Sequence, residues 1–199
     1  MTENPLTHAG ILGGFCLGFG FLLAVTYWLT ADAIQQRALD DKLVSLGQVI
    51  PAALYDNNPI ADAVSVPGRD SKAVLVYRAA RNHRVVAVAY EISGNGYAGE
   101  IRLMLGVDAE GHILGVRAIE HKETPGLGDK IEPTKSDWIT RFTGLWLGSP
   151  PVEKWKVKKD GGQFDQFSGA TITPRGVVGA IRGGLEFFAA NKAQLLEAQ

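Results

Sequence analysis

The feature that most constrains this chain is an uncharged run near its N-terminus. Residues 9–31 are 23 consecutive residues without a charged side chain. As an α-helix such a run extends about 34 Å, enough to cross a bilayer core of about 30 Å. Tyr27 and Trp28 stand near its end, where aromatic side chains gather at a membrane interface. We therefore expect a single transmembrane helix in the lipid bilayer.

A cleaved signal peptide is the alternative, because residues 31–33 read Ala-Asp-Ala. The preceding tail contains no Lys or Arg, and the run is longer than the roughly 7–15 residues of a signal core, so we expect the segment to be retained. Arg37 and Lys42 follow the run. By the positive-inside tendency, these two cations weakly favour a cytoplasmic location for the remaining residues.

The rest of the chain has the composition of a water-soluble domain. Of the 41 charged residues, only Glu3 precedes Asp32, and the totals are balanced at 20 Lys and Arg against 21 Asp and Glu. This balance argues against a nucleic-acid binder. Cys16 is the only cysteine and the four histidines are scattered, so we expect neither an intrachain disulfide nor a metal site.

Hydrophobic patterning predicts an α+β fold after the membrane segment. A helical period over residues 32–50, stopped by Pro51, predicts a stalk. Four runs predict the strands of two antiparallel hairpins: 72–77, 84–92, 101–107 and 112–119.

A last helix is predicted at the C-terminus. Apolar residues recur at helical spacing up to about Leu196, Thr173 is the expected N-cap, and Pro174 takes the first helical position. This helix should close a mainly antiparallel sheet domain.

Two further patterns have structural explanations. The string G-N-G-Y-A-G at residues 94–99 matches a dinucleotide-binding fingerprint, but a strand follows it rather than a helix, so we interpret it as a turn. The alternating lysines of residues 154–159 predict an edge strand with one charged face. In the alternative interpretation one of these lysines is the partner of an anion.

Two motifs suggest chemistry. H-K-E-T-P-G-L-G at residues 121–128 follows a strand, and its Pro and Gly residues predict a tight loop whose amides either bind a planar polar ligand or form an ordinary turn. D-Q-F-S-G-A-T at residues 165–171 precedes the last helix. Its hydroxyls either cap the helix or hold a phosphate at the helix N-terminus.

The residues of these motifs resemble a known family. D-Q-F-S-G-A-T-I-T is similar to the flavinylation signature of the FMN-binding domain found in the G subunit of the Rnf electron-transport complex. The same domain occurs in the C subunit of the sodium-translocating NADH:quinone reductase. H-K-E-T-P-G-L-G resembles the second signature of that family, and the longer strings around both motifs look more like the Rnf type.

The resemblance implies that Thr171 carries FMN through a phosphoester, installed by a separate flavin transferase that uses FAD and magnesium. It implies cofactor-binding roles for four residues of the second motif: Asp165, Ser168, Gly169 and Ala170. It also implies that four loop residues lie near the flavin ring: Glu123, Thr124, Leu127 and Gly128.

The resemblance also implies an organisation and a role. We expect a tail and transmembrane helix over 1–31, a helical stalk and connection over 32–70, and an FMN-binding domain over 71–199. The expected protein is an electron-relay subunit that works with other membrane subunits of an Rnf-type complex and is not a complete enzyme by itself. The family places its flavin domain in the periplasm, anchored to the bacterial cytoplasmic membrane. We follow this placement, although Arg37 and Lys42 weakly favour a cytoplasmic location.

Two alternatives come from other functional classes. The first is an anchored FMN-dependent reductase of a small extracytoplasmic molecule, which needs a proton donor beside the flavin, with His121, Tyr97 and Arg141 as candidates. The second is a non-redox anchored binding module in which the S-G-A-T sequence merely caps a helix.

Overall fold

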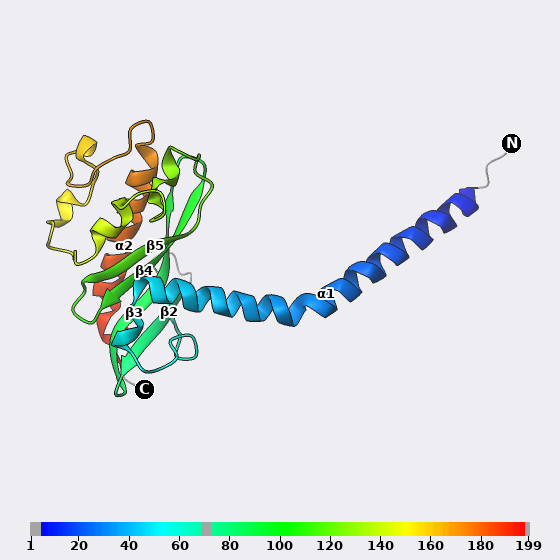
Figure 1. Ribbon diagram of the computed structural model, residues 1–199, viewed down its shortest axis with the longest axis horizontal. Helices are drawn as coiled ribbons and strands as arrows, with labels where there is room; N and C mark the ends of the chain where they lie inside the picture. Colours follow the sequence, from blue (N-terminus) through cyan, green and yellow to red (C-terminus); the bar gives the residue numbers. More distant parts are fainter. Residues whose placement is uncertain (1–4, 69–72, 198–199) are drawn as a thin grey trace. The chain divides into compact units, whose positions relative to one another are not determined.

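A computed structural model describes residues 5–68 and 73–197 (Figure 1). The chain divides into two compact units, Met1–Lys42 and Leu43–Gln199. The helix α1, Pro5–Val49, passes from the first unit into the second. The expected boundary between residues 70 and 71 lies outside the described residues, so that division remains a prediction.

The first unit contains one apolar helical segment. Leu6–Ile34 has 29 residues, and an 18-residue window within it has a mean hydropathy of 2.0 and no buried residue, so the segment is long and apolar enough to cross a membrane. The Thr26 and Thr30 hydroxyls donate to the carbonyls of Leu22 and Thr26, at 2.9 and 2.8 Å. These polar groups are therefore satisfied within the helix, as a lipid environment requires.

The second unit is built on a five-stranded antiparallel sheet in which each strand pairs with the next along the chain. The strands are β1 (Val64–Pro67), β2 (Ala73–Arg81), β3 (Arg84–Asn95), β4 (Glu100–Asp108) and β5 (Ile113–Glu120). Both predicted hairpins are thus confirmed.

The turns of the sheet follow from local sequence. Asn82 and His83 adopt positive φ angles of 51° and 61° between the paired residues Arg81 and Arg84. Positive φ at both central residues matches the right-handed twist of a hairpin. The string at residues 94–99 is confirmed as a turn, closed by the Gly96 amide donating to the Gly99 carbonyl at 2.7 Å.

The end of α1 covers one face of the sheet. Leu46, Val49 and Ile50 are buried there, in a cluster that includes Ala87 and Ala89 of β3. Gly106 and Gly115 pair across β4 and β5, and a Cβ on either would lie within 3.0 Å of the Val49 backbone. The glycines therefore allow this last turn of helix to rest directly on the strands.

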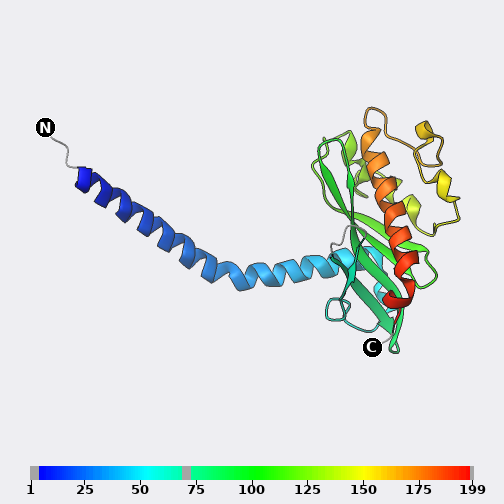
Figure 2. The ribbon, with the colours of Figure 1, turned by 180° about the vertical axis from the view of Figure 1, so that it is seen from behind.

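The helix α2, Ile172–Leu195, covers the opposite face (Figure 2). Its buried positions include Val177, Ile181, Leu185 and Phe188, at the predicted helical spacing. The Tyr90 hydroxyl of β3 donates to the Gly184 carbonyl at 2.9 Å.

Two glycines place the start of α2 at the end of β3. A Cβ on Gly176 would lie 2.2 Å from the Asn95 carbonyl oxygen, and one on Gly94 would lie 2.4 Å from the Gly176 carbonyl oxygen. This close approach places the first turn of α2 beside the β3–β4 turn.

The segment between β5 and α2 is made of short 3-10 turns: Gly128–Ile131, Trp138–Phe142, Val152–Lys154 and Lys158–Asp160. Aromatic side chains hold these turns together, for example Phe142 stacked on Phe164 with ring centroids 4.7 Å apart.

The predicted edge strand at residues 154–159 is wrong. The segment runs from the end of the 3-10 turn Val152–Lys154 to the start of the 3-10 turn Lys158–Asp160, and its one bridge joins Val157 to Phe164 in the parallel sense. Buried Trp155 and Val157 face the aromatic cluster, and Gly161 turns the chain with a φ of 80°. Alternation of buried and charged residues therefore arises here without a strand.

Candidate functional site

A cavity of about 550 Å³ lies at the start of α2. Its lining includes seven of the nine predicted site residues: Glu123, Thr124, Leu127, Gly128, Gly169, Ala170 and Thr171. Tyr97, Lys159 and Ile172 complete it. The structure therefore brings together the two motifs that are separated by about 45 residues in sequence.

The loop after β5 is a compact turn. The Leu127 and Gly128 amides both donate to the Thr124 carbonyl, at 3.1 and 3.2 Å. Gly126 has a φ of 79°, in the left-handed region that glycine adopts without strain. The tight loop predicted from Pro125 and its neighbouring glycines is confirmed, and it opens onto the cavity.

Glu123 joins three segments at the base of this loop. Its side chain is buried, its Oε1 accepts from the Ala98 amide at 3.0 Å, and its Oε2 accepts from the Thr173 hydroxyl. These contacts tie the loop to the β3–β4 turn and to the first turn of α2.

Two glycines make room for this carboxylate. A Cβ on Gly96 would lie 2.3 Å from Oε1 of Glu123, and one on Gly128 would lie 2.4 Å from Oε2. Larger residues at either position would therefore displace the carboxylate or the loop.

The S-G-A-T sequence forms a second turn against the first. The Ala170 amide donates to the Phe167 carbonyl at 3.2 Å, and Gly169 has a φ of 80°. A Cβ on Gly169 would lie 3.4 Å from Cδ2 of Leu127. The two motifs therefore lie close together at the edge of the cavity, with room at Gly169 for little more than a Cβ.

Thr171 occupies the N-cap position of α2 but makes no capping hydrogen bond with its side chain. The expectation that Thr173 is the N-cap, with Pro174 at the first helical position, is wrong. The helix begins earlier, at Ile172, and the Thr173 hydroxyl bonds Glu123 instead. The helix N-terminus beside Thr171 can therefore stabilise an anion through its partial positive charge.

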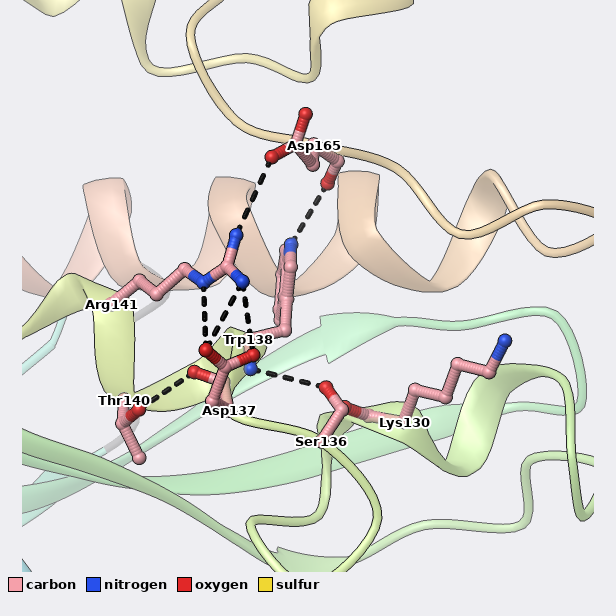
Figure 3. Close-up of polar contacts among 7 residues, drawn as sticks. All are labelled: Lys130, Ser136, Asp137, Trp138, Thr140, Arg141 and Asp165. Carbon is pink, nitrogen blue, oxygen red and sulfur yellow. Dashed lines mark hydrogen bonds and ion pairs between the residues drawn. The ribbon is translucent and has the colours of Figure 1, made fainter.

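The remaining two predicted residues do not line the cavity. Ser168 and Asp165 are both exposed to solvent. Figure 3 shows Asp165 reached by Arg141 and by the Trp138 indole, which donates to the Asp165 carbonyl at 2.9 Å. Asp165 therefore anchors the motif to the 3-10 turn Trp138–Phe142.

Basic groups surround the Asp165 carboxylate. The Lys158 ammonium lies 2.6 Å from Oδ1, and the Arg141 guanidinium lies 3.6 Å from Oδ2. The hydrogen bond from Lys158, with the added attraction of both cations, holds the pKa of Asp165 below its ordinary value. The carboxylate is ionised at neutral pH.

Of the three candidate proton donors, Tyr97, His121 and Arg141, one lies at the cavity. Tyr97 lines the cavity and is 74% exposed. His121 bonds Glu132 at 3.1 Å, and Arg141 pairs with Asp137 and Asp165. Neither His121 nor Arg141 contributes to the cavity lining.

Sequence reasoning missed Lys159 and Ile172 as lining residues, and Thr173 as the partner of Glu123. Ile172 follows directly from its place beside Thr171. Thr173 and Lys159 gave only local signals, a cap and a charged run, while their positions depend on contacts distant in sequence.

Among the residues that the structure describes, no cluster of His, Cys, Asp or Glu could hold a metal ion.

The residues of the cavity fit a flavin mononucleotide. The volume lies in the range of about 300–1,000 Å³ that small-ligand sites occupy. Leu127 and Tyr97 offer apolar and aromatic surface, and Glu123 and Thr124 offer polar atoms. The Thr171 hydroxyl makes no capping hydrogen bond and lies at a helix N-terminus, where a phosphate is favoured.

Comparisons with known proteins agree with this geometry. The FMN-binding domain family matches residues 96–186, and the RnfG N-terminal region matches residues 1–49. The G subunit of the ion-translocating oxidoreductase complex of Cereibacter sphaeroides is 50% identical over 194 residues, covering 98% of this chain and 89% of the relative. Its counterpart in Stutzerimonas stutzeri is 52% identical over 199 residues, covering 93% and 87%. The chain belongs to the RnfG family.

The matched regions locate the parts of this RnfG chain. Every residue that lines the cavity falls within the FMN-binding domain match, and the apolar helix segment falls within the N-terminal match. The crystal structure of Shewanella oneidensis NqrC is 24% identical, covers 76% of this chain and 73% of its own, and superposes with a TM-score of 0.50. At that identity the likeness shows the shared α+β fold.

Proposed function

We propose that this RnfG chain is a covalently flavinylated electron-relay subunit of a membrane-bound, ion-translocating oxidoreductase complex, with FMN attached to Thr171 by a phosphoester. The observation that carries the proposal is the meeting of both motifs around one cavity at the N-terminus of α2. FMN supplies the redox chemistry when bound, and a covalent link keeps it on the carrier between turnovers.

The attachment chemistry requires an accessible hydroxyl and room for a second enzyme. In transfer from FAD, a bond forms between Thr171 Oγ and phosphorus, the pyrophosphate bond breaks, AMP leaves and the hydroxyl proton passes to solvent. The exposed Ser168 and Gly169 leave the approach to Thr171 open. We infer a separate flavin transferase, with magnesium, as the maturation partner.

The cavity residues have distinct roles in this proposal. The amides at the start of α2 face the phosphate, whose negative charge the helix dipole stabilises. Glu123 holds the loop in place and sets a negative charge near the flavin ring, and Leu127 provides apolar surface. Asp165 fixes the turn that presents Thr171.

We also propose the location and the partners. The apolar helix anchors the chain in the cytoplasmic membrane, where the other membrane subunits of the complex lie, and the second unit faces the periplasm. The names of the relatives support a place in a multi-subunit ion-translocating complex, and the apolar segment supports the anchor.

Flavin retention tests the proposal against both alternatives. The full chain is produced with and without a flavin transferase, denatured, and freed of small molecules before its absorption is measured. We expect a yellow protein only in the presence of the transferase. A colourless protein in both preparations would favour the non-redox binding module, and steady turnover of the isolated chain with a soluble acceptor would favour the reductase.

A further inference from the structure

Four cationic side chains surround the attachment motif, and three of them already have carboxylate partners. Lys158 lies 2.6 Å and Arg141 3.6 Å from Asp165. Arg175, one turn into α2, pairs with Asp160 through bonds of 2.5 and 2.6 Å. These three charges are therefore compensated within the protein.

Lys159 is the fourth cation, and its situation differs. Within residues 5–68 and 73–197, no carboxylate lies at ion-pair distance from its ammonium group: the adjacent Asp160 feels the charge of Lys159 but pairs with Arg175. Lys159 is also the one lysine of the 154–159 run that lines the cavity. Its side chain is thus available to a negative group inside the site.

The backbone around Lys159 is held beside the first turn of α2. The Lys159 amide donates to the Gln166 side chain at 3.3 Å, and the Lys158 amide donates to the Phe164 carbonyl at 2.7 Å. The Asp160–Arg175 pair links the same segment to α2, and the Arg175 amide donates to the Thr171 carbonyl at 3.3 Å. The segment that contains Lys159 is therefore held near Thr171 by bonds to Phe164 and Gln166 and by the link from Asp160 to α2.

We propose that Lys159 is the cation that pairs with the phosphate of the flavin on Thr171. The inference rests on the proposed attachment at Thr171 and identifies a further residue of that site. A phosphoester linked to threonine keeps one negative charge, and a lysine ammonium is a point charge suited to phosphate. The helix N-terminus and Lys159 would then act on the phosphate from two sides, while Lys158, Arg141 and Arg175 remain with their carboxylates.

The test compares Lys159→Gln with Lys156→Gln in the full flavinylated chain in detergent. Lys156 is exposed in the same segment and does not line the cavity, so its variant is a matched control for a general loss of charge. The ³¹P resonance of the phosphoester reports directly on its ionic partner. We expect it to move in Lys159→Gln and to remain in place in Lys156→Gln.

Thermal unfolding supplies a second, independent readout. Lys159→Gln should lower the melting temperature of the flavinylated chain by about 1–3 °C, the effect of a partly exposed ion pair in a chain of this size. In a Thr171→Ala background, where no phosphate is attached, the same substitution should have no effect.

The outcomes separate this inference from the proposal on which it rests. A wild-type chain without any protein-bound ³¹P signal would reject the attachment itself. A signal that is present but unmoved by Lys159→Gln would reject the role of Lys159 alone. If the resonance stays in place while the flavin midpoint potential changes, the lysine contacts the ring, and the phosphate assignment is wrong.

Discussion

Glu123 joins three segments that are far apart in sequence, and its neighbours show how closely the site depends on it. Both carboxylate oxygens accept hydrogen bonds, and Gly96 and Gly128 leave the space that the carboxylate fills. Truncating it to alanine would remove these bonds together with the charge. A substitution that preserves the bonds is therefore needed to isolate the electrostatic effect.

We expect Glu123→Gln to raise the midpoint potential of the bound flavin. A glutamine oxygen can accept from the Ala98 amide while its NH₂ group donates to the Thr173 hydroxyl, so the geometry persists and the negative charge is lost. A carboxylate beside the ring disfavours the addition of electrons. Its removal is worth about 1–3 kcal/mol, or about 20–60 mV for a two-electron couple.

A redox titration of flavinylated wild type and Glu123→Gln provides the measurement, with the flavin absorption spectrum recorded alongside. If Glu123→Gln has the same midpoint potential as the wild type, Glu123 lies away from the flavin ring. A lower potential would show that the electrostatic sign assigned to it is wrong.

Thr173 is a second residue whose role changed with the structure. Because its hydroxyl donates to a buried carboxylate, Thr173→Val should cost about 1–3 kcal/mol of unfolding free energy, more than a lost helix cap. Thr173→Ser keeps the hydroxyl and is the control. Denaturant unfolding measures both, and flavin should remain attached in each. Equal stabilities for Val and wild type would argue against the bond to Glu123.

Among the elements, the sequence was most informative where the structural signal is local. Two Val- and Tyr-rich runs separated by a short polar stretch predicted the β2–β3 hairpin, and helical spacing predicted the buried face of α2. The start of α2 was misplaced because the partner of Thr173 is 50 residues away. The 3-10 turns between β5 and α2 depend on contacts among aromatic side chains such as Phe142 and Phe164, which no short pattern contains.

The same distinction between local signals and contacts distant in sequence applies to the candidate site. Motif residues could be named from the sequence, because glycine turns and a threonine before a helix have local signatures. Lys159 could not be separated from its neighbouring lysines, since only the packing of the segment determines which one reaches the cavity.

The loop that carries the S-G-A-T sequence should loosen in acid. The pKa of Asp165 is lowered in the folded protein. Its ion pairs therefore stabilise the loop fully at pH values above the ordinary aspartate pKa of about 3.9. That contribution is lost progressively as the pH falls through the lowered folded-state pKa. Hydrogen exchange of residues 156–171 between pH 6 and pH 2 would follow this loss.

Asp165→Asn provides the comparison, because it lacks the carboxylate at every pH. The variant should exchange faster than wild type at neutral pH, and the difference should shrink in acid. Identical exchange at neutral pH would show that the ion pairs with Lys158 and Arg141 do not hold the loop.

At the scale of the whole molecule, the chain combines an apolar helix segment with a flavin domain of the RnfG family. We expect the second unit on the periplasmic side and the apolar segment uncut. Protease added to intact spheroplasts should therefore digest the domain while cytoplasmic proteins survive. Protection of the domain, or a mature N-terminus near Ala33, would contradict this topology.

The attachment of FMN to Thr171 is the central claim, and intact mass tests it most directly. The wild-type chain made with a flavin transferase should gain the mass of one FMN less one water, and Thr171→Ala should gain nothing while remaining folded. Thr173→Ser is the control, with its hydroxyl two residues away, and should carry the full increment. Persistence of the increment on Thr171→Ala, or its absence from the wild-type chain, would contradict the account.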